Sequence, residues 1–469
     1  MFPKCTLIKI NGKFAQTLAA VTVNLFIIAD GMHYGWSSPI IPKLKSADPQ
    51  IPLDKTSITI LETMYLIGGL AGLPATMYLT DILGRKIAIL SASVLNLLSW
   101  ILIACTTNIY VLYIARFLAG MTADMGFVSI PMYTAEISDK NIRGALTGFV
   151  LVATILGVII MYSAGPFLTI SESALIGAGL NVMSIGTFSF LPESPYYLLK
   201  NNDEEKGRKS LKLFRRNSNV EQELDEIRIA VERQRSERGK FIELIANKGN
   251  RKAMIIITVL SATLHFGGMS VITMNLNEIF SEAEEFLSPE ASSIICSIVM
   301  LIGVIIALRL VDKFGRKILL FTSCVLTGLS LTLLATYFVL KDNKYHYNIH
   351  WIPLFAVICY SVFLRIGICL VPLVMNAEIF PLNVKSKGMT YGDFIGIISG
   401  IICIYIYQEL THRFGIYYPL YIFATCCMLT AFFTVFFIPE TKGKTLEEIQ
   451  MILRGEKLKG SEEIKDVNV

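Results

Sequence analysis

The residues of this sequence that could do chemistry are acidic and basic side chains that occur in the same order in each half of the chain. A turn of the form Asp-x-x-Gly-Arg-Lys comes first, a Glu with a basic residue seven positions later comes second, and a Pro-Glu pair comes third. Charges that pair in one conformation and separate in another bias a conformational equilibrium, but one exposed ion pair is weak, so a gate needs several. The pattern therefore predicts a charge network that acts as a gate. Its expected members are Asp81, Gly84, Arg85, Lys86, Arg116, Glu136, Arg143 and Glu193 in the first half, and Asp312, Gly315, Arg316, Lys317, Glu378, Lys385 and Glu440 in the second.

The sequence lacks the residue patterns of an enzyme or a metalloprotein. No nucleophile, base and orienting group occur together, no phosphate-binding glycine loop is present, and the nine cysteines show no metal or redox spacing. The net charge of +5 is modest and its basic residues fall in loops, so it does not indicate a nucleic-acid partner. We expect no catalytic residue, no cofactor and no metal site.

Long apolar segments must position these charges. Of the 469 residues, 53% are hydrophobic and 17% are charged, whereas a soluble domain is about 25% charged. The apolar residues fall into runs of about 20, long enough to cross a bilayer core of about 30 Å. Together with the repeat, this predicts an all-α membrane protein with twelve transmembrane helices in two pseudo-symmetric six-helix bundles. The expected spans are 14–37, 57–80, 86–106, 110–134, 144–164 and 172–191, then 254–280, 290–311, 316–340, 351–379, 388–408 and 415–438.

Four parts of the chain follow from these spans. They are an N-terminal bundle (1–191), a linker (192–253), a C-terminal bundle (254–438) and a tail (439–469). Basic residues gather in the linker and in the short loops of one side, which places both termini and the linker in the cytoplasm. The alternative to the gate is that these basic residues serve only as an anchor that orients the protein in the membrane. Apolar residues at helical spacing between Val220 and Val231 predict an amphipathic helix in the linker, and Thr445 with Glu448 predicts a capping box that opens a tail helix.

Several motifs together resemble those of a known family. They are the two Asp-x-x-Gly-Arg-Lys turns, Arg116-Phe117 with Gly120, Pro131-Met132-Tyr133 before Glu136, Arg143-Gly144, Pro192-Glu193-Ser194-Pro195, Glu378-Ile379-Phe380-Pro381 and Pro439-Glu440-Thr441-Lys442-Gly443. The set is similar to the signature of the sugar porters of the major facilitator superfamily, and Gly31–Pro39 resembles the first helix of insect facilitated trehalose transporters. The resemblance implies the major facilitator fold and alternating access, in which two six-helix halves move about a central site.

The positions that correspond to the family's sugar contacts depart from its pattern. Sugar porters present amides and tryptophans to the sugar hydroxyls, whereas this chain has mostly apolar residues there. A buried hydroxyl without a partner costs about 1–3 kcal/mol, so the resemblance implies weak sugar binding, a different or less polar solute, or loss of transport. The histidine of the set could contact substrate or could be a core residue. These positions are Leu151, Leu264, His265, Ser270, Met300 and Leu373.

Four further polar residues are expected at membrane depth, where a charge costs at least about 2.5–3.5 kcal/mol. Asp30 and His33 share one helix face and could bind substrate, relay a proton or satisfy each other. Asp124 has either a functional role or a buried hydrogen bond. Arg365 could bind an anionic substrate or pair with Asp393 or Asp124.

These observations favour a facilitative carrier of a hexose or trehalose-like sugar at the plasma membrane. Proton-driven sugar porters carry an acid close to the position of Ser37, so the serine favours uniport, although Asp30 leaves proton coupling open. The alternatives are a carrier of a non-sugar organic solute and a non-transporting membrane sensor. The expected partners are a small-molecule solute and the lipid bilayer, and the oligomeric state is left open.

Overall fold

The computed structural model describes residues 12–45, 55–139, 141–215, 220–236, 241–281, 287–343, 349–381, 383–444 and 446–456. The side chains of residues 55, 234–236, 312 and 446 are not among those described. The predicted cap at Thr445, the end of the tail and the side chain of Asp312 therefore lie outside the described residues. Within the ranges above, every regular element is a helix.

The first half of the chain consists of long helices and one π turn. Its elements are α1 (Gly12–Gly35), α2 (Ser37–Leu44), α3 (Lys55–Tyr78), η1 (Leu79–Leu83), α4 (Arg85–Cys105), α5 (Ile109–Ile137), α6 (Arg143–Ala164) and α7 (Ile170–Phe188). A capping box opens α7, because Thr169 and Glu172 each accept a hydrogen bond from the backbone N–H of the other.

The linker and the second half continue the helical pattern. The linker holds α8 (Pro195–Lys200), α9 (Glu204–Phe214), α10 (Val220–Ser236) and α11 (Ile242–Ala246). The second half holds α12 (Lys248–Phe266), α13 (Met269–Met274), α14 (Leu276–Ser281), α15 (Pro289–Phe314), α16 (Arg316–Asp342), α17 (Ile352–Leu364), η2 (Arg365–Cys369), α18 (Leu370–Glu378), α19 (Lys385–Phe414), α20 (Tyr417–Phe437) and α21 (Leu446–Arg454).

All twelve predicted spans coincide with helical segments, which confirms the all-α membrane fold. Eleven segments of the described chain are long and apolar enough to cross a membrane. The segment that corresponds to the prediction 172–191 is α7, which carries Glu172 and Asn181 and is not among the eleven.

Two predicted spans of the second half are interrupted rather than continuous. The span 254–280 breaks at Gly268, whose φ of 86° lies in the left-handed region that favours glycine, and it continues as α13 and α14. The span 351–379 contains the π turn η2 between α17 and α18. Sequence hydrophobicity could not reveal either break, because neither interrupts the apolar run.

The chain divides into two compact units. Unit 1 comprises residues 1–33, 67–161 and 167–236, and unit 2 comprises residues 34–66, 162–166 and 237–469. Unit 2 therefore includes the end of α1 together with α2 and the first part of α3. The predicted bundle boundaries at 191 and 254, which follow the sequence repeat, remain a prediction.

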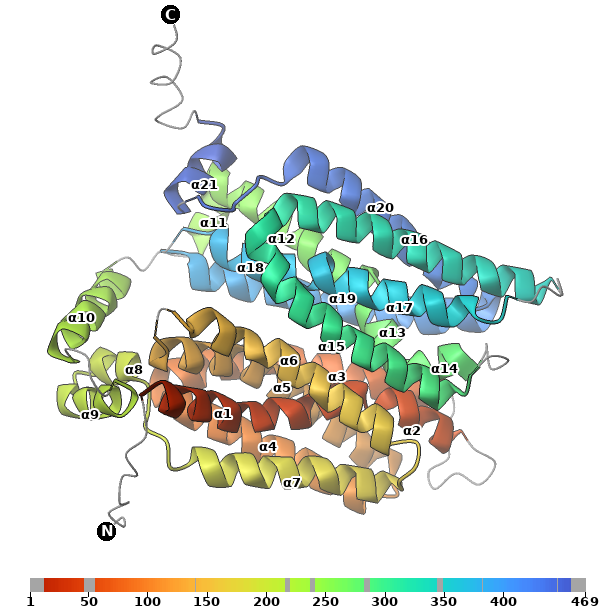
Figure 1. Cartoon of the computed structure of the whole chain (residues 1–469), viewed down its shortest axis with the longest axis horizontal. Helices are drawn as coiled ribbons and strands as arrows, with labels where there is room; N and C mark the ends of the chain where they lie inside the picture. Colours follow the sequence, from red (N-terminus) through yellow and green to blue (C-terminus); the bar gives the residue numbers. More distant parts are fainter. Residues whose placement is uncertain are drawn as a thin grey trace, which may run out of the picture. The chain divides into compact units, whose positions relative to one another are not determined.

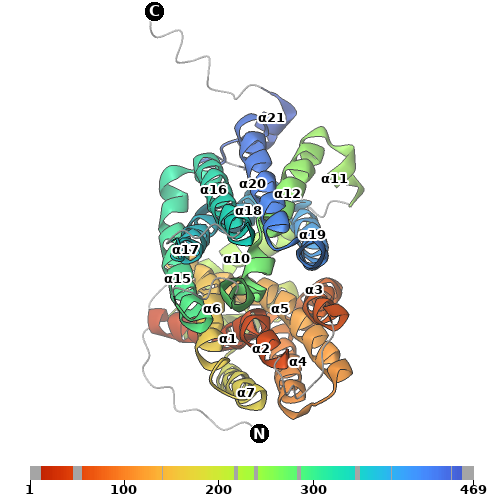
Figure 2. The same ribbon diagram turned by 90° about the vertical axis from the view of Figure 1, so that its right-hand side faces the viewer.

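Corresponding helices pack in the same way in each unit. In unit 1, α4 packs against α5 and α7, and in unit 2, α16 packs against α17 and α20 (Figures 1 and 2). Within unit 1, α1 crosses α6 closely: a methyl group at Gly31 would lie 2.2 Å from the carbonyl oxygen of Thr154, and one at Gly157 would lie 2.1 Å from that of Ile28. Small residues of this kind allow membrane helices to approach closely.

The linker helices α8, α9 and α10 form a group of their own within unit 1 (Figure 1). The apolar side chains at helical spacing on α10, which predicted an amphipathic helix, face α8 and α9. Leu224, Ile227 and Val231 are buried with Leu199 and Leu211. The linker therefore covers its own apolar stripe.

Candidate functional site

A cluster of charged side chains lies at one end of unit 1, where the π turn η1 meets α4. Gly84 has a φ of 102°, a conformation that a side chain disfavours, and it lets the chain reverse so that α4 begins at Arg85. The Arg85 guanidinium donates to both carboxylate oxygens of Glu136 at 2.8–3.1 Å and to the carbonyl of Thr80 at 3.1 Å. Both partners are largely buried, so this ion pair is stronger than an exposed one.

The Pro-Glu-Ser segment after α7 completes this cluster. Glu193 accepts hydrogen bonds from the backbone N–H of Lys86 at 3.0 and 3.1 Å and of Ser194 at 2.7 Å. The hydroxyl of Ser194 in turn donates to Glu136. One network thus joins the turn before α4, the end of α5 and the segment after α7.

Unit 2 contains the same arrangement, made by the repeated residues. Arg316 donates to Glu378 at 2.8 Å and to the carbonyl of Val311 at 3.1 Å. Glu440 accepts from the backbone N–H of Arg316 and of Lys317, each at 3.0 Å, and Thr441 donates to Glu378 at 2.6 Å. Gly315 has a φ of 86°, like Gly84 in unit 1. The sequence repeat is therefore also a repeat of contacts.

Other members of the predicted network lie outside these two clusters. Asp81 is mostly exposed and pairs with Lys200 of α8 at 2.8 Å. Arg143 donates to the carbonyl of Ser138 at 3.4 Å and forms no ion pair within the described part of the chain. Lys385 is within electrostatic reach of Glu378 without a hydrogen bond among those seen. Arg116 contacts residues at membrane depth instead.

The two repeated glutamates differ in electrostatics although their contacts match. Burial raises the pKa of Glu193, and the N–H groups of Ser194 and Lys86 only partly counter it. Burial also raises the pKa of Glu440, but the backbone N–H groups of Lys442, Arg316 and Lys317 outweigh it, so the net pKa is lowered from 4.5. Glu193 therefore takes up a proton at a higher pH than Glu440 does.

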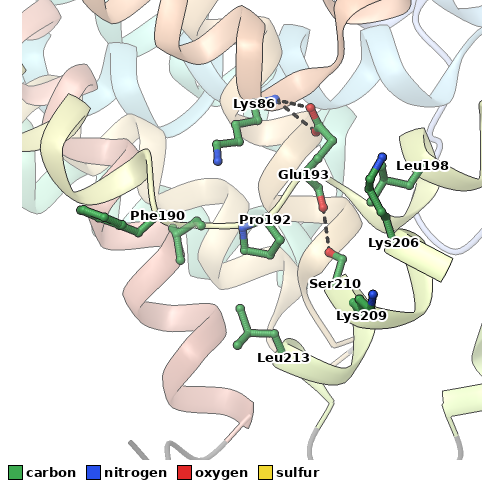
Figure 3. A pocket seen from close by; sticks show the side chains of 10 residues that line it. Lys86, Phe190, Pro192, Glu193, Leu198, Lys206, Lys209, Ser210 and Leu213 are labelled. Atoms are coloured by element: carbon green, nitrogen blue, oxygen red, sulfur yellow. Dashed lines mark hydrogen bonds between the residues drawn. The ribbon is translucent and has the colours of Figure 1, made fainter. Parts of the chain in front are cut away.

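A pocket of about 490 Å³ opens beside the unit 1 cluster. Figure 3 shows the 190–193 segment along one wall and Lys206, Lys209 and Ser210 of α9 along another. The Ser210 hydroxyl donates to the carbonyl of Glu193 at 2.7 Å. The linker therefore contacts the charge cluster directly.

Sequence reasoning missed three residues of this region. Ser194 and Thr441 each bridge to the glutamate that binds the arginine, and a hydroxyl residue that follows Pro-Glu in both halves was the available signal. Arg215, at the end of α9, pairs with Asp139 at 2.8 Å and with Glu223 at 3.0 Å. No repeat or motif marks Arg215.

At membrane depth, unit 1 holds a buried polar cluster. Arg116 donates to the carbonyl of His33 at 2.6 Å, and Asn96 donates to Asp30 at 3.5 Å and to Thr122 at 2.9 Å. The His33 ring stacks on Trp100 at 3.6 Å, and neither ring nitrogen has a hydrogen bond within the described residues. Asp30 and His33 thus lie in one cluster, as their spacing predicted, but they do not bond to each other among the contacts seen.

In unit 2, His265 and Ser270 come together at the break between α12 and α13. His265 Nδ1 and the Ser270 hydroxyl are 2.9 Å apart, and the Tyr34 hydroxyl donates to Ser270 at 3.4 Å. His265 Nε2 has no hydrogen bond in the described chain, and the ring lies beside Gly396 and Gly400 of α19. One imidazole nitrogen is therefore fixed and the other is available to a hydroxyl.

Arg365 and Met300 also meet in unit 2. Arg365 Nη2 lies 3.8 Å from the Met300 sulfur, and Nη1 lies 3.8 Å from the Cys369 sulfur. The ion pairs seen in the described residues do not include Arg365, so the pairing with Asp393 suggested by the sequence is absent there.

The remaining predicted positions are separated from these groups. Asp124 accepts from Thr76 at 3.1 Å, a partly buried hydrogen bond between α5 and α3. Leu151 belongs to unit 1, Leu264 is half-buried on α12 and Leu373 is half exposed on α18. In the described part of the chain, no three His, Cys, Asp or Glu residues are grouped so that they could hold a metal ion.

Comparison with known proteins places this geometry in a family context. The family model described as "Sugar (and other) transporter" matches residues 6–453. The "Facilitated trehalose transporter Tret1-2 homolog" of Drosophila sechellia is 28% identical over 456 residues, which cover 95% of this chain and 92% of that protein. The "Facilitated trehalose transporter Tret1" of Anopheles gambiae is also 28% identical, over 94% of this chain and 56% of that protein.

A solved structure shares the fold. The inward open conformation of the xylose transporter XylE from E. coli matches with a TM-score of 0.78 over 92% of this chain and 98% of that one. Sequence identity in this match is 20%, so the likeness concerns the fold.

Proposed function

Because the chain belongs to the family of sugar and other transporters, we propose that it is a facilitative carrier of a hexose or trehalose-like sugar. It works by alternating access in the plasma membrane, with both termini in the cytoplasm. The sugar class is supported by the relatives, which are named as trehalose transporters, and by the xylose transporter of the same fold.

The repeated charge cluster is the observation that carries the mechanism. In unit 1, Arg85 joins the turn before α4 to the end of α5, and Glu193 joins the same turn to the segment after α7. In unit 2, Arg316 joins the turn before α16 to the end of α18, and Glu440 joins that turn to the segment after α20. Two units with the same cytoplasmic lock are what a carrier needs if each half moves as a body. The clusters hold in one state of the carrier and release in the other.

Unit 2 would bind the sugar largely through contacts with the hydroxyl groups of the sugar. His265 offers one free ring nitrogen, held in place by Ser270, and Tyr34 adds a hydroxyl. Leu264, Met300 and Leu373 offer apolar surface where the family has amides and a tryptophan. A site with few amide partners supports weak binding of a single sugar rather than tight binding.

Uptake into vesicles that contain the purified protein tests this function. Radiolabelled glucose, trehalose and a panel of organic ions are compared between pH 5.5 and 8. We expect saturable sugar uptake that does not depend on a proton gradient. Uptake of a non-sugar organic ion in place of every neutral or acidic sugar would contradict the sugar class, and binding without flux would contradict transport.

Arg85→Ala tests the charge cluster as a gate. Since a hydrogen bond to a charged group is worth about 1.5–3 kcal/mol, we expect uptake to fall at least about tenfold. Lys212→Ala is the control, because it removes one exposed basic charge from the linker, which is predicted to lie on the same side of the membrane as Arg85. Equal loss in both variants, or an inverted N terminus in Arg85→Ala, would favour the topological anchor over the gate.

A further inference from the structure

We infer that Arg365 binds a carboxylate of the transported solute, so the preferred substrate is an acidic sugar such as a hexuronate. The inference rests on the proposed function, since it concerns the solute bound by unit 2. It goes further by assigning an anion site, which the relatives' names do not suggest.

The Arg365 side chain is buried and lacks an oxygen partner. The residue is 6% exposed, and its polar contacts are the sulfurs of Cys369 and Met300, each at 3.8 Å. Its Nε has no hydrogen bond to any described residue. Thiol and thioether sulfurs are weak acceptors, so they do not offset the burial of a guanidinium at membrane depth. The missing partner is a negative charge.

Two described acids of unit 2 do not pair with Arg365. Asp393, in the same unit, forms no hydrogen bond or ion pair with Arg365 in the described part of the chain. Glu378 is held by Arg316 and Thr441. A solute carboxylate would therefore meet Arg365 without competition from these groups.

The backbone that carries Arg365 is a π turn held in one conformation by neighbouring residues. Arg365 begins the π turn η2, a helix defect that occurs often at functional sites. The turn is fixed by Ser323, whose hydroxyl donates to the carbonyl of Phe363 at 2.6 Å and accepts from the N–H of Ile368 at 3.0 Å. Gly367 packs so closely against Ser323 that a methyl group would lie 2.3 Å from its Cβ. The guanidinium is therefore presented from a rigid segment.

Three tyrosines of unit 2 are close enough to this cation to interact with its charge. Tyr34, Tyr162 and Tyr360 all lie within electrostatic reach of Arg365. Tyr34 is also the start of the hydrogen-bond chain to Ser270 and His265. A cation next to several hydroxyls matches a ring that carries both hydroxyls and a carboxylate. One guanidinium binds a carboxylate through two parallel hydrogen bonds and offsets its single charge, whereas a phosphate carries up to about two charges.

Glucose and glucuronate, which share a ring and differ at C6, are the probes for this site. Their uptake into vesicles is measured for the wild type and for Arg365→Gln, and their binding is measured as the shift in melting temperature of the purified protein. We expect the wild type to prefer glucuronate, and Arg365→Gln to lower the glucuronate-to-glucose ratio at least about tenfold, the worth of one charged hydrogen-bond pair. Arg309→Gln is the matched control, since it removes an exposed arginine from the neighbouring helix α15.

Met300→Glu keeps the inference testable if Arg365→Gln does not fold. The new carboxylate replaces the sulfur beside Arg365 Nη2 and occupies the site from within, so the preference for glucuronate should disappear while the protein stays folded.

The outcomes separate this inference from the proposed function. Glucose uptake without a preference for glucuronate, or a ratio that is the same in Arg365→Gln and wild type, overturns the anion site and leaves the sugar carrier. If no sugar is taken up, the sugar carrier is overturned. If glucuronate nevertheless raises the melting temperature of the wild type, and Arg365→Gln and Met300→Glu abolish that shift, the anion site is supported. Absence of both overturns both.

Discussion

At the scale of single residues, equivalent positions of the two repeats behave differently. Glu193 and Glu440 each accept backbone hydrogen bonds at the start of a helix. Glu193 is the more deeply buried of the two, so burial dominates its pKa, whereas backbone N–H groups dominate that of Glu440. The repeat thus conserves contacts more closely than electrostatics.

This difference predicts unequal effects of neutral substitutions. Glu440→Gln should lower the free energy of unfolding by about 1 kcal/mol at pH 7, because it weakens charge-assisted hydrogen bonds in a partly exposed site. Glu193→Gln should have a smaller effect, since burial already disfavours its charged form. Thermal unfolding of the purified variants in detergent measures both.

The pH dependence of these variants has a definite sign. The pKa of Glu440 is lowered, so its contribution to stability is present above the ordinary value of 4.5 and is lost as pH falls through the lowered pKa. The pKa of Glu193 is raised, so this residue binds a proton at a higher pH in the folded chain than in the unfolded chain, and on acidification wild type should first gain stability relative to Glu193→Gln and only at lower pH lose stability relative to Glu440→Gln. The reverse order would contradict the assignment.

The glycine of each turn is a second residue-scale requirement. Gly84→Ala places a methyl group 2.3 Å from Oε2 of Glu193 at a φ of 102°. We expect a loss of at least about 1 kcal/mol in stability, the usual penalty of left-handed backbone for a residue with a side chain. Uptake should fall as well. Gly186→Ala in α7 is the control, because a methyl group there meets nothing within 4 Å. A stability unchanged in Gly84→Ala would show that the turn can relax.

At the scale of elements, the linker helices α8, α9 and α10 are a folded part of unit 1. These helices bury an apolar core of their own, and Arg215 joins the end of α9 to Asp139, to Glu223 and to the carbonyl of Ile137 at 2.7 Å. Gln16 of α1 adds a hydrogen bond to the carbonyl of Phe214 at 2.9 Å. These contacts tie α9 to α1 and to the end of α5.

Arg215→Ala should release the linker. The side chain is 6% exposed, and removal of one partner from a buried ion pair costs about 3–5 kcal/mol. Limited proteolysis of the membrane-embedded protein should then cut between residues 195 and 236 faster than in wild type. Arg208→Ala, which breaks exposed pairs with Glu204 and Glu221, is the control and should leave the cutting rate unchanged. Equal rates in Arg215→Ala and wild type would show that the apolar core alone holds the linker.

At the scale of the whole molecule, the spans and the basic loops predict one orientation. The connection between α4 and α5 is short and lacks basic residues, whereas the start of α12 carries Lys248, Arg251 and Lys252. The positive-inside rule places the first outside and the second in the cytoplasm.

Cysteine labelling checks this orientation. Thr107→Cys and Lys252→Cys, both at exposed positions, are made in a Cys105→Ser background. An impermeant maleimide should label Thr107→Cys in intact cells and Lys252→Cys after permeabilisation. The opposite pattern would invert the topology and would move both charge clusters to the outer face.

The sequence alone determined the helical spans, the repeat and the arginines and glutamates of both charge clusters, because apolar run length and turn residues are local properties of the chain. It did not determine which charges meet, since Arg85 and Glu136 or Arg316 and Glu378 pair only once several helices have packed. Only the tertiary structure put Arg116 with His33 instead of with the clusters, bridged each cluster through Ser194 or Thr441, and left Arg365 facing sulfur rather than a carboxylate. The physical reason is that a charge pair is decided by a few ångströms between side chains far apart in sequence, which neither composition nor periodicity encodes.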